Sequence, residues 1–392
     1  MLFPDLLANQ SLIAVSVIKS IWKNNKWICR CTVSLKEKEM KLGIIGLPQT
    51  GKTTVYNALT RGNQPTTVSG KIEIHTAMVE VPDPRVDRLS EMYKPKKTTY
   101  ARVNYADIAG LDGSSAGSIS GKLLNELGQM DGFIHVVRCF EDDSVAHMSG
   151  SIDPGRDIQS MDGELLLNDL IAVERKLEKL GEERHKGGRD KGEVEREADL
   201  FGKLQAVLAE EKPLRTMALT PEEIKQISGF QFLTLKPMMV VLNLGEGQDP
   251  PDVSGITPYS KVVPLQGRLE MEIAQLPPDE AEIFLEEYGI AEPSLFRMIR
   301  ESYDLLGLQS FFTVGEDEVR AWTVRVGAAA PEAAGVIHSD LQKGFIRAEV
   351  VSYEDLSQLG GMSAARDQGK LRVEGKEYII QDGEIVHVRF NL

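Results

Sequence analysis

The sequence predicts an α/β fold in which a doubly wound, mostly parallel sheet carries an inserted helical hairpin and precedes a small α+β domain. Three observations predict it. A glycine-rich loop joins an apolar strand to a helix within residues 42–59, strand-like and helix-like segments alternate over residues 71–140, and two apolar runs with helical spacing follow within residues 161–210. Alternating strands and helices form parallel sheets with helices on both faces.

Composition narrows the class of protein. The chain has 392 residues, enough for two or three domains, with an ordinary hydrophobic content of 42%. Its net charge of −14 disfavours indiscriminate binding to DNA or to membranes, so contact with RNA requires a local basic patch. Three cysteines, Cys29, Cys31 and Cys139, form no disulfide framework and no four-cysteine metal site. These features favour a reducing cytoplasm.

Residues 1–39 differ from the rest. Their apolar stretch, residues 12–22, is interrupted by polar side chains, is too short for a membrane span, and lacks a basic leader and a cleavage site. Met40 stands directly before the first predicted strand. We expect 1–39 to be an N-terminal extension without fixed structure and Met40 to be the native start.

The loop at residues 46–53 reads Gly-Leu-Pro-Gln-Thr-Gly-Lys-Thr and fits the phosphate-binding pattern Gly-x-x-x-x-Gly-Lys-[Ser/Thr] in full. Its glycines let successive backbone N–H groups turn inward, and the helix that follows adds its positive dipole end. We expect Lys52 to reach the β- and γ-phosphates and serve catalysis, and the Thr53 hydroxyl to ligate Mg²⁺. The alternative is a strand–helix turn without a ligand. The nucleotide-binding residues predicted here are Gly46, Leu47, Pro48, Gln49, Thr50, Gly51, Lys52, Thr53 and Thr54.

A second phosphate-proximal motif, Asp107-Ile-Ala-Gly110, closes the predicted strand 101–108. An aspartate there can complete the Mg²⁺ shell with Thr53, and the Gly110 N–H can sense the γ-phosphate during catalysis. Leu111 follows, where many GTPases carry a water-orienting glutamine. Because leucine makes no hydrogen bond, hydrolysis there must use another group or proceed slowly.

The segments between and after these motifs predict further elements. Strand 71–81 ends at a Pro-Asp-Pro turn, helix 85–92 follows it, and an apolar strand occupies residues 133–140. His135 lies inside that apolar strand. It is either a core histidine or a functional group, and its surroundings in sequence leave both interpretations open.

Residues 161–210 predict an antiparallel helical hairpin, inserted in the α/β domain over residues 161–216. Apolar residues recur at spacings of three and four in two runs, separated by a charged, glycine-containing tip at 182–193. The hairpin is either a packed structural insert or an arm that docks protein or RNA. The repeating residues are Leu166, Leu170, Val173, Leu177 and Leu180, then Val194, Ala198, Phe201, Leu204 and Leu208.

The predicted strand 238–242 leads into Asn-Leu-Gly-Glu at 243–246, where GTPases carry Asn-Lys-x-Asp. The carboxylate of Glu246 sits on a longer stem, and Leu244 replaces the lysine that lies along the base, so the strict pairing with guanine is lost. We expect the base to be read by Asn243, Leu244 and Glu246, and by the loop after the last strand at Gln266 and Gly267.

Residues 307–392 predict a separate α+β domain without a catalytic constellation. Segment 320–326 is strand-like, 329–337 is helix-like, and alternation over 378–388 about Asp382-Gly383 predicts a β-hairpin. Its cations form either a basic face or scattered solvated charge; they are Lys343, Arg347, Arg366, Lys370, Arg372 and Lys376.

Taken in order, these motifs resemble those of the Obg-like ATPase (YchF) family from Met40 to the C-terminus. The residues that carry the resemblance are GLPQTGKTT at 46–54, VPDPR at 81–85, DIAGL at 107–111, HVVRCFEDD at 135–143, LTLKP at 233–237, Asn-x-x-Glu at 243–246, VRAWTV at 319–324 and IHSDLQKGFIRAEV at 337–350.

The resemblance implies a P-loop NTPase domain of the TRAFAC class at 40–306 with a coiled-coil insert, and a ubiquitin-like β-grasp TGS domain at 307–392. It implies a slow, monomeric, cytoplasmic ATPase that uses Mg²⁺ and ATP, and whose recognition of guanine is relaxed, so that GTP is a possible substrate. It also implies that the protein acts with the ribosome (the large subunit or 70S) in translation and stress responses. The family's histidine proposed to assist hydrolysis falls on His135. A GTPase, or a nucleotide-dependent ribosome-binding adaptor with little hydrolysis, is the alternative.

The sequence departs from the family pattern at the first switch. Lys71 stands where the family has a threonine that closes over Mg²⁺, and the Phe-rich sequence before it is absent. We expect nucleotide binding to survive this departure and the turnover rate to be affected.

Overall fold

The computed structural model describes residues 40–64, 74–109, 119–186, 189–287, 290 and 292–391. These residues divide into two compact units, a first unit of 40–82 with 102–307 and a second unit of 83–101 with 308–391. The sequence predicted an uninterrupted domain at 40–306, and the structure differs by grouping Asp83–Ala101 with the C-terminal residues. The predictions for 1–39, Lys71, Gly110 and Leu111 lie outside the described residues.

The first unit contains a six-stranded sheet of order β2-β4-β1-β5-β6-β7. Strand β2 is antiparallel to β4, and the other neighbours are parallel, so the predicted mostly parallel α/β sheet is confirmed. The strands are β1 (Lys41–Ile45), β2 (Ile74–Glu80), β4 (Arg102–Ile108), β5 (Gly132–Arg138), β6 (Met238–Asn243) and β7 (Lys261–Leu265).

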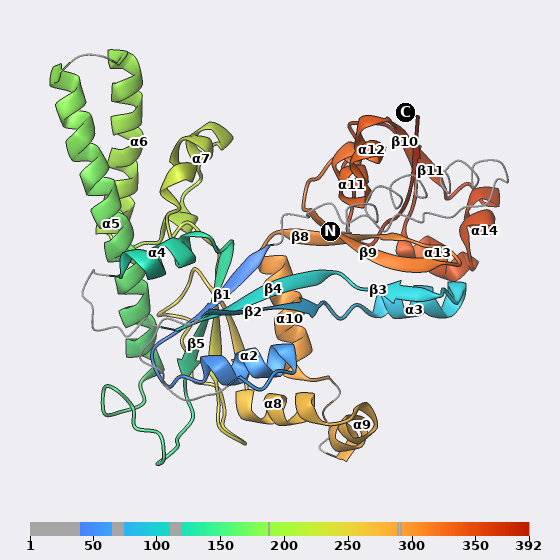
Figure 1. The fold of residues 1–392 in the computed structure, drawn as a ribbon, viewed down its shortest axis with the longest axis horizontal. Coiled ribbons are helices and arrows are strands. Elements are labelled where there is room, and N and C mark those ends of the chain that lie inside the picture. The colour runs from blue at the N-terminus through green and yellow to red at the C-terminus, as the bar shows by residue number, and fades with distance from the viewer. Residues whose placement is uncertain are drawn as a thin grey trace, which may run out of the picture. The chain divides into compact units, whose positions relative to one another are not determined.

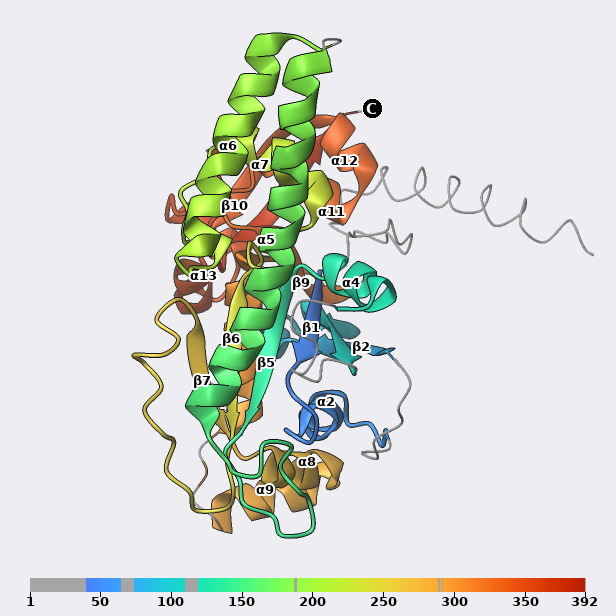
Figure 2. The same ribbon diagram turned by 90° about the vertical axis from the view of Figure 1, so that its left-hand side faces the viewer.

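Helices cover both faces of this sheet. Helices α2 and α8 lie side by side on one face, and the long α5 runs along the other face past β5 (Figures 1 and 2). None of the described helices combines the length and apolar character that crossing a bilayer requires. The helices are α2 (Lys52–Thr60), α4 (Gly121–Gly128), α5 (Pro154–Lys186), α6 (Lys191–Ala209), α7 (Pro221–Ile227), α8 (Gly267–Gln275), α9 (Pro278–Glu287) and α10 (Ser294–Leu305), with 3₁₀ turns η2 (Leu214–Thr216) and η3 (Ser228–Phe230).

The central strands are apolar because both of their faces are covered. Every residue of β5 and of β6 is buried, as expected for parallel strands between two helix layers. Side chains of β5 such as Phe133 pack with Met161 and Leu165 of α5. The carboxyl ends of β1, β4, β5 and β6 therefore meet at one edge of the sheet, where the predicted site residues lie.

The predicted helical hairpin is confirmed. Helices α5 and α6 are antiparallel, and α5 begins at Pro154, seven residues earlier than the start predicted from the apolar repeat at 161. Val173 of α5 packs against Phe201 and Leu204 of α6, which are all fully buried. The Asp190 side chain caps α6 by accepting a hydrogen bond from the Glu193 N–H.

The second unit contains a sheet of order β11-β10-β12-β8-β9-β3. Strand β12 runs parallel to β8 and antiparallel to β10, and α11 packs on one face with Ala333 and Ala334 in the core. The strands are β3 (Lys97–Thr99), β8 (Leu308–Thr313), β9 (Glu318–Arg325), β10 (Phe345–Val351), β11 (Arg372–Glu374) and β12 (Ile385–Phe390). The helices are α3 (Pro84–Tyr93), α11 (Ala330–Ile337), α12 (Ser339–Lys343), α13 (Tyr353–Leu359) and α14 (Met362–Asp367).

The predicted hairpin about Asp382-Gly383 is wrong. Ile379 forms only an isolated bridge to Ala329, whereas β12 pairs with β10 and β8. The turn is tied to the sheet instead, because the Asp382 carboxylate accepts hydrogen bonds from the Ser310 N–H (3.0 Å) and from Arg85 (2.7 Å).

Three of the six cations named from the sequence in this unit are paired with carboxylates. Arg366 lies 3.6 Å from Glu349, Lys370 lies 3.0 Å from Asp355, and Arg372 pairs with Glu384. Of the two interpretations offered by the sequence, scattered charge fits these residues better.

Candidate functional site

The loop between β1 and α2 has a backbone that only particular residues can adopt. Gly46 has φ 152°, and a Cβ there would lie 2.4 Å from the carbonyl oxygen of Val136. Gly51 has φ 90°, and its Cβ would lie 2.2 Å from Nδ2 of Asn243. Gln49 adopts a left-handed φ of 62°, which is uncommon for a residue with a side chain. The loop therefore requires glycine at two positions and holds Gln49 in an uncommon backbone conformation.

The N-terminus of α2 is left open to an anion. Its N-cap, Gly51, offers no side-chain acceptor, and the first turn contains no acidic residue. By contrast, Ser120 caps α4 and Asp190 caps α6 through their side chains. Backbone N–H groups in a first helical turn have no acceptor within the helix, and the helix dipole adds positive potential there. The end of α2 therefore provides the donors that a phosphate group needs.

Lys52 lies at this helix end and donates to the loop itself. Its Nζ is 2.9 Å from the carbonyl oxygen of Gly46 and 2.7 Å from that of Leu47. Burial lowers the pKa of Lys52 to about 8, and the charge of Asp107 opposes this shift. The buried Thr50 hydroxyl also donates to Leu47, at 3.0 Å. The ammonium is thus held beside the loop by neutral carbonyl oxygens, which carry less charge than a phosphate.

Thr53 and Asp107 meet at the end of β4. The Thr53 hydroxyl donates to Oδ2 of Asp107 at 2.8 Å. Burial raises the pKa of Asp107, while the Thr53 bond and the charges of Lys52 and His75 oppose the shift. The other carboxylate oxygen, Oδ1, is buried and has no hydrogen-bond partner within the described protein. A buried, unpaired acceptor beside a hydroxyl fits the shell of a hard cation such as Mg²⁺.

The protein itself supplies few ligands for such a cation. Among the described residues, no group of three or more histidine, cysteine, aspartate or glutamate side chains could hold a metal ion. Mg²⁺ commonly binds through one or two protein oxygens, with phosphates and water completing its octahedron. Thr53 and Asp107 fit that pattern, because their oxygens lie next to the phosphate-binding loop.

His135 lies in the middle of the sheet, between Ile45 of β1 and Val240 of β6. Its side chain is 1% exposed, and Nδ1 has no hydrogen-bond partner among the described residues. Burial, followed by the nearby charge of Lys52, lowers the pKa of His135 to about 3. The imidazole is therefore neutral at physiological pH. Of the two interpretations left open by the sequence, its placement in the core matches the first.

The residues predicted to read the base take different positions. Asn243 is buried, and its Nδ2 donates to the carbonyl oxygen of Thr50 (3.0 Å) while its Oδ1 accepts from the Gly267 N–H (3.0 Å). It thereby ties the loop to the start of α8. Leu244 is 7% exposed and packs in the core, whereas Glu246 is exposed. Gln266 is half-buried at the N-cap of α8.

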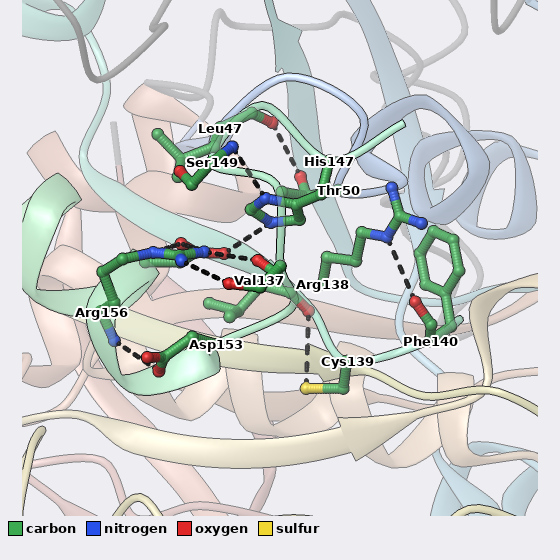
Figure 3. Close-up of polar contacts among 12 residues, drawn as sticks. Leu47, Thr50, Val137, Arg138, Cys139, Phe140, His147, Ser149, Asp153 and Arg156 are labelled. Carbon is green, nitrogen blue, oxygen red and sulfur yellow. Dashed lines mark hydrogen bonds and ion pairs between the residues drawn. The ribbon is translucent and has the colours of Figure 1, made fainter. Parts of the chain in front are cut away.

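Sequence reasoning missed Arg138, which ends β5 beside Asn243. Its side chain is 2% exposed, its Nε donates to the carbonyl oxygen of Phe140 at 3.1 Å, and its guanidinium covers the Phe140 ring at 4.6 Å (Figure 3). Phe140 in turn lies 3.8 Å from a Cβ built on Gly51. The feature of the sequence that could have identified this residue is an arginine at the end of an apolar strand.

The segment that connects β5 to α5 is fixed by a second cluster. His147 Nε2 lies 3.0 Å from Oδ2 of Asp157, and the Arg156 guanidinium binds the other oxygen at 2.8 Å (Figure 3). His147 Nδ1 accepts from the Ser149 N–H at 3.1 Å. These contacts hold the segment folded onto the start of α5.

A separate hollow of about 660 Å³ lies elsewhere in the first unit, lined by residues 215–219, Ile224, Tyr259 and Lys261 among others. It has no glycine-rich loop, and Lys261 is already paired with Glu301 at 2.9 Å. The loop at 46–53 is therefore the better candidate for a phosphate site.

Comparisons with known proteins find relatives over most of the chain. Residues 308–391 match the family described as "YchF-GTPase_C: Protein of unknown function (DUF933)". The chain is 44% identical to the "Ribosome-binding ATPase YchF" of Haemophilus influenzae, covering 90% of this chain and 99% of the relative. It is 42% identical to the protein of that name from Bacillus subtilis (89% and 99%) and 37% identical to "Obg-like ATPase 1" of Gallus gallus (90% and 92%).

A solved structure also matches. The YchF GTPase of Schizosaccharomyces pombe superimposes with a TM-score of 0.78 at 32% sequence identity, covering 90% of this chain and 98% of that one.

Proposed function

Because the chain belongs to the YchF (Obg-like ATPase) family, we propose that it binds ATP at residues 46–54 and hydrolyses it with Mg²⁺. One observation carries the proposal: a strained glycine loop delivers the chain to a helix whose N-terminus has no side-chain cap, with Lys52 beside it. Relatives of the same name at 42–44% identity are called ATPases, which supports the hydrolysis step.

In the proposed reaction, backbone N–H groups of 47–53 bind the phosphate oxygens, and Lys52 exchanges its loop carbonyls for the β- and γ-phosphates. Thr53 and Asp107 hold Mg²⁺, which when bound neutralises charge on the phosphates. Gly110 would sense the γ-phosphate. Catalysis is then positional and electrostatic, with water attacking in line.

The proposed rate is slow, for two reasons. Leu111 cannot orient the attacking water, because its side chain makes no hydrogen bond. His135, the candidate to assist hydrolysis, is neutral and buried, so it acts in this proposal by supporting the sheet beneath Lys52 rather than by holding water directly.

ATP is the proposed nucleotide, with GTP as the second candidate. Glu246 is exposed and free to face the base, whereas the Asn243 amide is engaged by Thr50 and Gly267 and contributes mainly by holding the loop. The matched fission-yeast structure is called a GTPase, which keeps GTP in consideration.

The proposed partner is the ribosome, because the bacterial relatives are named ribosome-binding. We propose a monomer that acts in the cytoplasm. The strand order β9-β8-β12-β10-β11, with β8 and β12 parallel at its centre, supports a ubiquitin-like β-grasp (TGS) assignment for the second unit. A ribosome-binding adaptor with little hydrolysis is the other candidate, favoured by Lys71 and Leu111.

Titration separates these candidates. ATP and GTP are titrated into the protein and into its Lys52→Ala variant, with the exposed Lys225→Ala as a matched control. We expect tight ATP binding, weaker GTP binding, and loss of both in Lys52→Ala only. Single-turnover hydrolysis with and without ribosomes then separates an ATPase from an adaptor. Unchanged ATP affinity in Lys52→Ala would refute the site.

A further inference from the structure

The hollow of about 660 Å³ in the first unit has the size and the lining of a ligand site. Its walls are mainly apolar and include Met217, Leu219 and Leu235. Two further lining residues are large apolar side chains near half exposure, Ile224 of α7 at 47% and Tyr259 at 48%. Clefts of roughly 300–1,000 Å³ with mainly apolar walls and a few polar groups commonly bind ligands.

The Leu-Thr-Leu-Lys-Pro motif at 233–237, which has no place in the nucleotide site, holds one wall of this hollow. The Asp169 carboxylate of α5 accepts from the Thr234 N–H and from the Thr234 hydroxyl, both at 2.7 Å. The Thr234 carbonyl oxygen accepts in turn from the Arg215 N–H at 3.0 Å. Because these contacts lie within the protein itself, the wall formed by Leu235 and its neighbours exists before any ligand arrives.

The lysine of the motif contacts a different element. The Nζ of Lys236 donates to the carbonyl oxygens of Leu127 (2.8 Å), Gly128 (2.5 Å) and Met130 (2.6 Å), at the end of α4. An ammonium group has three N–H donors, so these acceptors use all of them. Lys236 therefore anchors the motif and supplies no charge to the hollow.

Arg215 supplies the positive charge of the hollow. Its Nη2 donates to the Ser260 hydroxyl at 3.2 Å, whereas its buried Nε has no hydrogen-bond partner and the guanidinium forms no ion pair among the described residues. Burial lowers the pKa of Arg215, and the charge of Asp162 opposes this shift. Lys261, the other cation in the lining, is already paired with Glu301 at 2.9 Å. A largely buried cation without a carboxylate partner is unfavourable, and an incoming carboxylate would relieve it.

Residues 217–219 present unpaired backbone groups along the hollow. Met217 is extended, with φ −82° and ψ 138°, and so is Thr220, with φ −72° and ψ 160°. Between them, the N–H and C=O groups of Ala218 and Leu219 make no hydrogen bond with the described part of the chain. Donors and acceptors that alternate along an extended chain are what a second extended chain pairs with.

We propose that this hollow binds an extended segment of a partner protein, which pairs with the backbone of residues 217–219. The segment places an apolar side chain against Ile224 and Tyr259 and brings a carboxylate to Arg215. An acidic, apolar peptide fits better than RNA, because the walls are mainly apolar and RNA binding draws on several unpaired cations. The site lies wholly within the first unit and does not depend on nucleotide binding.

The test uses the full-length protein and two pools of fluorescent heptapeptides. Each pool has a fixed leucine and, two positions later, either a fixed aspartate or a fixed lysine. Residues i and i+2 of an extended chain share a face, so both fixed side chains can reach the hollow. We expect the aspartate pool to bind at least about tenfold more tightly than the lysine pool, measured by fluorescence anisotropy.

Three variants separate the contacts. Arg215→Gln should remove the preference for aspartate and leave the melting temperature near that of wild type, because no ion pair is lost. Ala218→Pro removes a backbone N–H beside a residue whose extended conformation suits a following proline. Ile224→Asp adds a negative charge to the apolar wall. The last two should each weaken binding of the aspartate pool about tenfold, whereas Ile283→Asp, at an exposed isoleucine of α9 outside the hollow, is the matched control and should change nothing.

Equal affinities for the two pools, or no binding of either, would overturn the proposal. So would wild-type binding in Arg215→Gln or a loss of equal size in Ile283→Asp. If Arg215→Gln does not fold, Ile224→Asp and Ala218→Pro decide through the same titration. Tighter binding of a short oligouridylate than of either pool, lost in Ile224→Asp, would assign the hollow to RNA instead. Dimers in sedimentation that Ile224→Asp dissociates would assign it to a second copy of this chain, and either result would overturn the proposed partner.

Discussion

The N-terminus of α2 and the C-terminus of α4 present the same group, a buried lysine ammonium bonded to backbone carbonyls, in opposite ways. Lys52 has two carbonyl partners, and Lys236 has three. Burial lowers the pKa of each lysine to about 8. At α2 the cation lies among donors at the positive end of a helix, whereas at α4 it lies among acceptors at the negative end.

The difference separates a binding site from a structural contact. At α4, the three N–H donors of Lys236 meet three carbonyl acceptors, so none of its donors remains for a ligand. At α2, the Gly51 cap leaves the first-turn N–H groups without a side-chain acceptor and places a cation beside them. An excess of donors around one cation is an unfavourable arrangement that a triphosphate would relieve.

The largest expected effect comes from Lys52→Ala. Removing the ammonium from the N-terminus of α2 should weaken ATP binding by at least about 100-fold, or about 2.7 kcal/mol, because the remaining donors carry only partial charge. Isothermal titration measures it, and the melting temperature should change little. If Lys52→Ala lowers the melting temperature strongly while ATP affinity stays unchanged, Lys52 is a structural contact like Lys236 and the comparison fails.

Asn243→Ala should have the next largest effect. The variant removes both hydrogen bonds that hold the strained loop to α8 and should destabilise the protein by about 2 kcal/mol, measured by urea unfolding. Because these two hydrogen bonds hold the phosphate-binding loop in place, ATP affinity should fall as well. Stability equal to wild type would mean that the loop keeps its shape without Asn243.

How far the sequence could predict this arrangement depends on how local the interactions are. The loop at 46–53 was predictable because its glycines, lysine and threonine are contiguous and act through their own backbone. The tie made by Asn243 was not, since its partners at Thr50 and Gly267 lie far away in sequence. The contacts of Lys236 were harder still to predict, because its partners are backbone carbonyls, which every residue has.

Strand pairing shows the same limit in the second unit. Alternation over 378–388 correctly indicated the strand that begins at Ile385, but it could not indicate which strands are neighbours, and the predicted hairpin was wrong. Likewise, the helix predicted at 85–92 came without any indication of the unit it joins, and the short strand β3 that follows it was not predicted. Periodicity reports which face is buried, and not the partner that buries it.

The pH dependence of ATP affinity tests whether Lys52 is charged in the free protein. With its pKa near 8, Lys52 is half deprotonated at that pH in the free protein and loses most of its charge above it, while bound phosphates would raise its pKa again. The complex therefore binds the proton more tightly, and ATP affinity should fall as pH rises above 8, approaching tenfold per unit.

Calorimetry between about pH 7 and pH 9.5 checks this, with Lys52→Arg as the control because arginine stays protonated throughout. An ATP affinity that is flat over this range in the wild-type protein would show that Lys52 keeps its charge without a ligand. In that case the loop carbonyls alone keep Lys52 charged.

Glu246→Asp should have the smallest effect, and it tests recognition of the base rather than of the phosphates. Glu246 is exposed, so its shortening should leave stability unchanged and shift only the choice of nucleotide. An aspartate restores the residue that pairs with guanine N1–H and N2–H₂ in GTPases, so GTP affinity should rise a few-fold relative to ATP. Competition binding measures the ratio. An unchanged ratio would mean that Glu246 does not face the base, and that discrimination comes from the buried residues around Asn243, where groups are already paired.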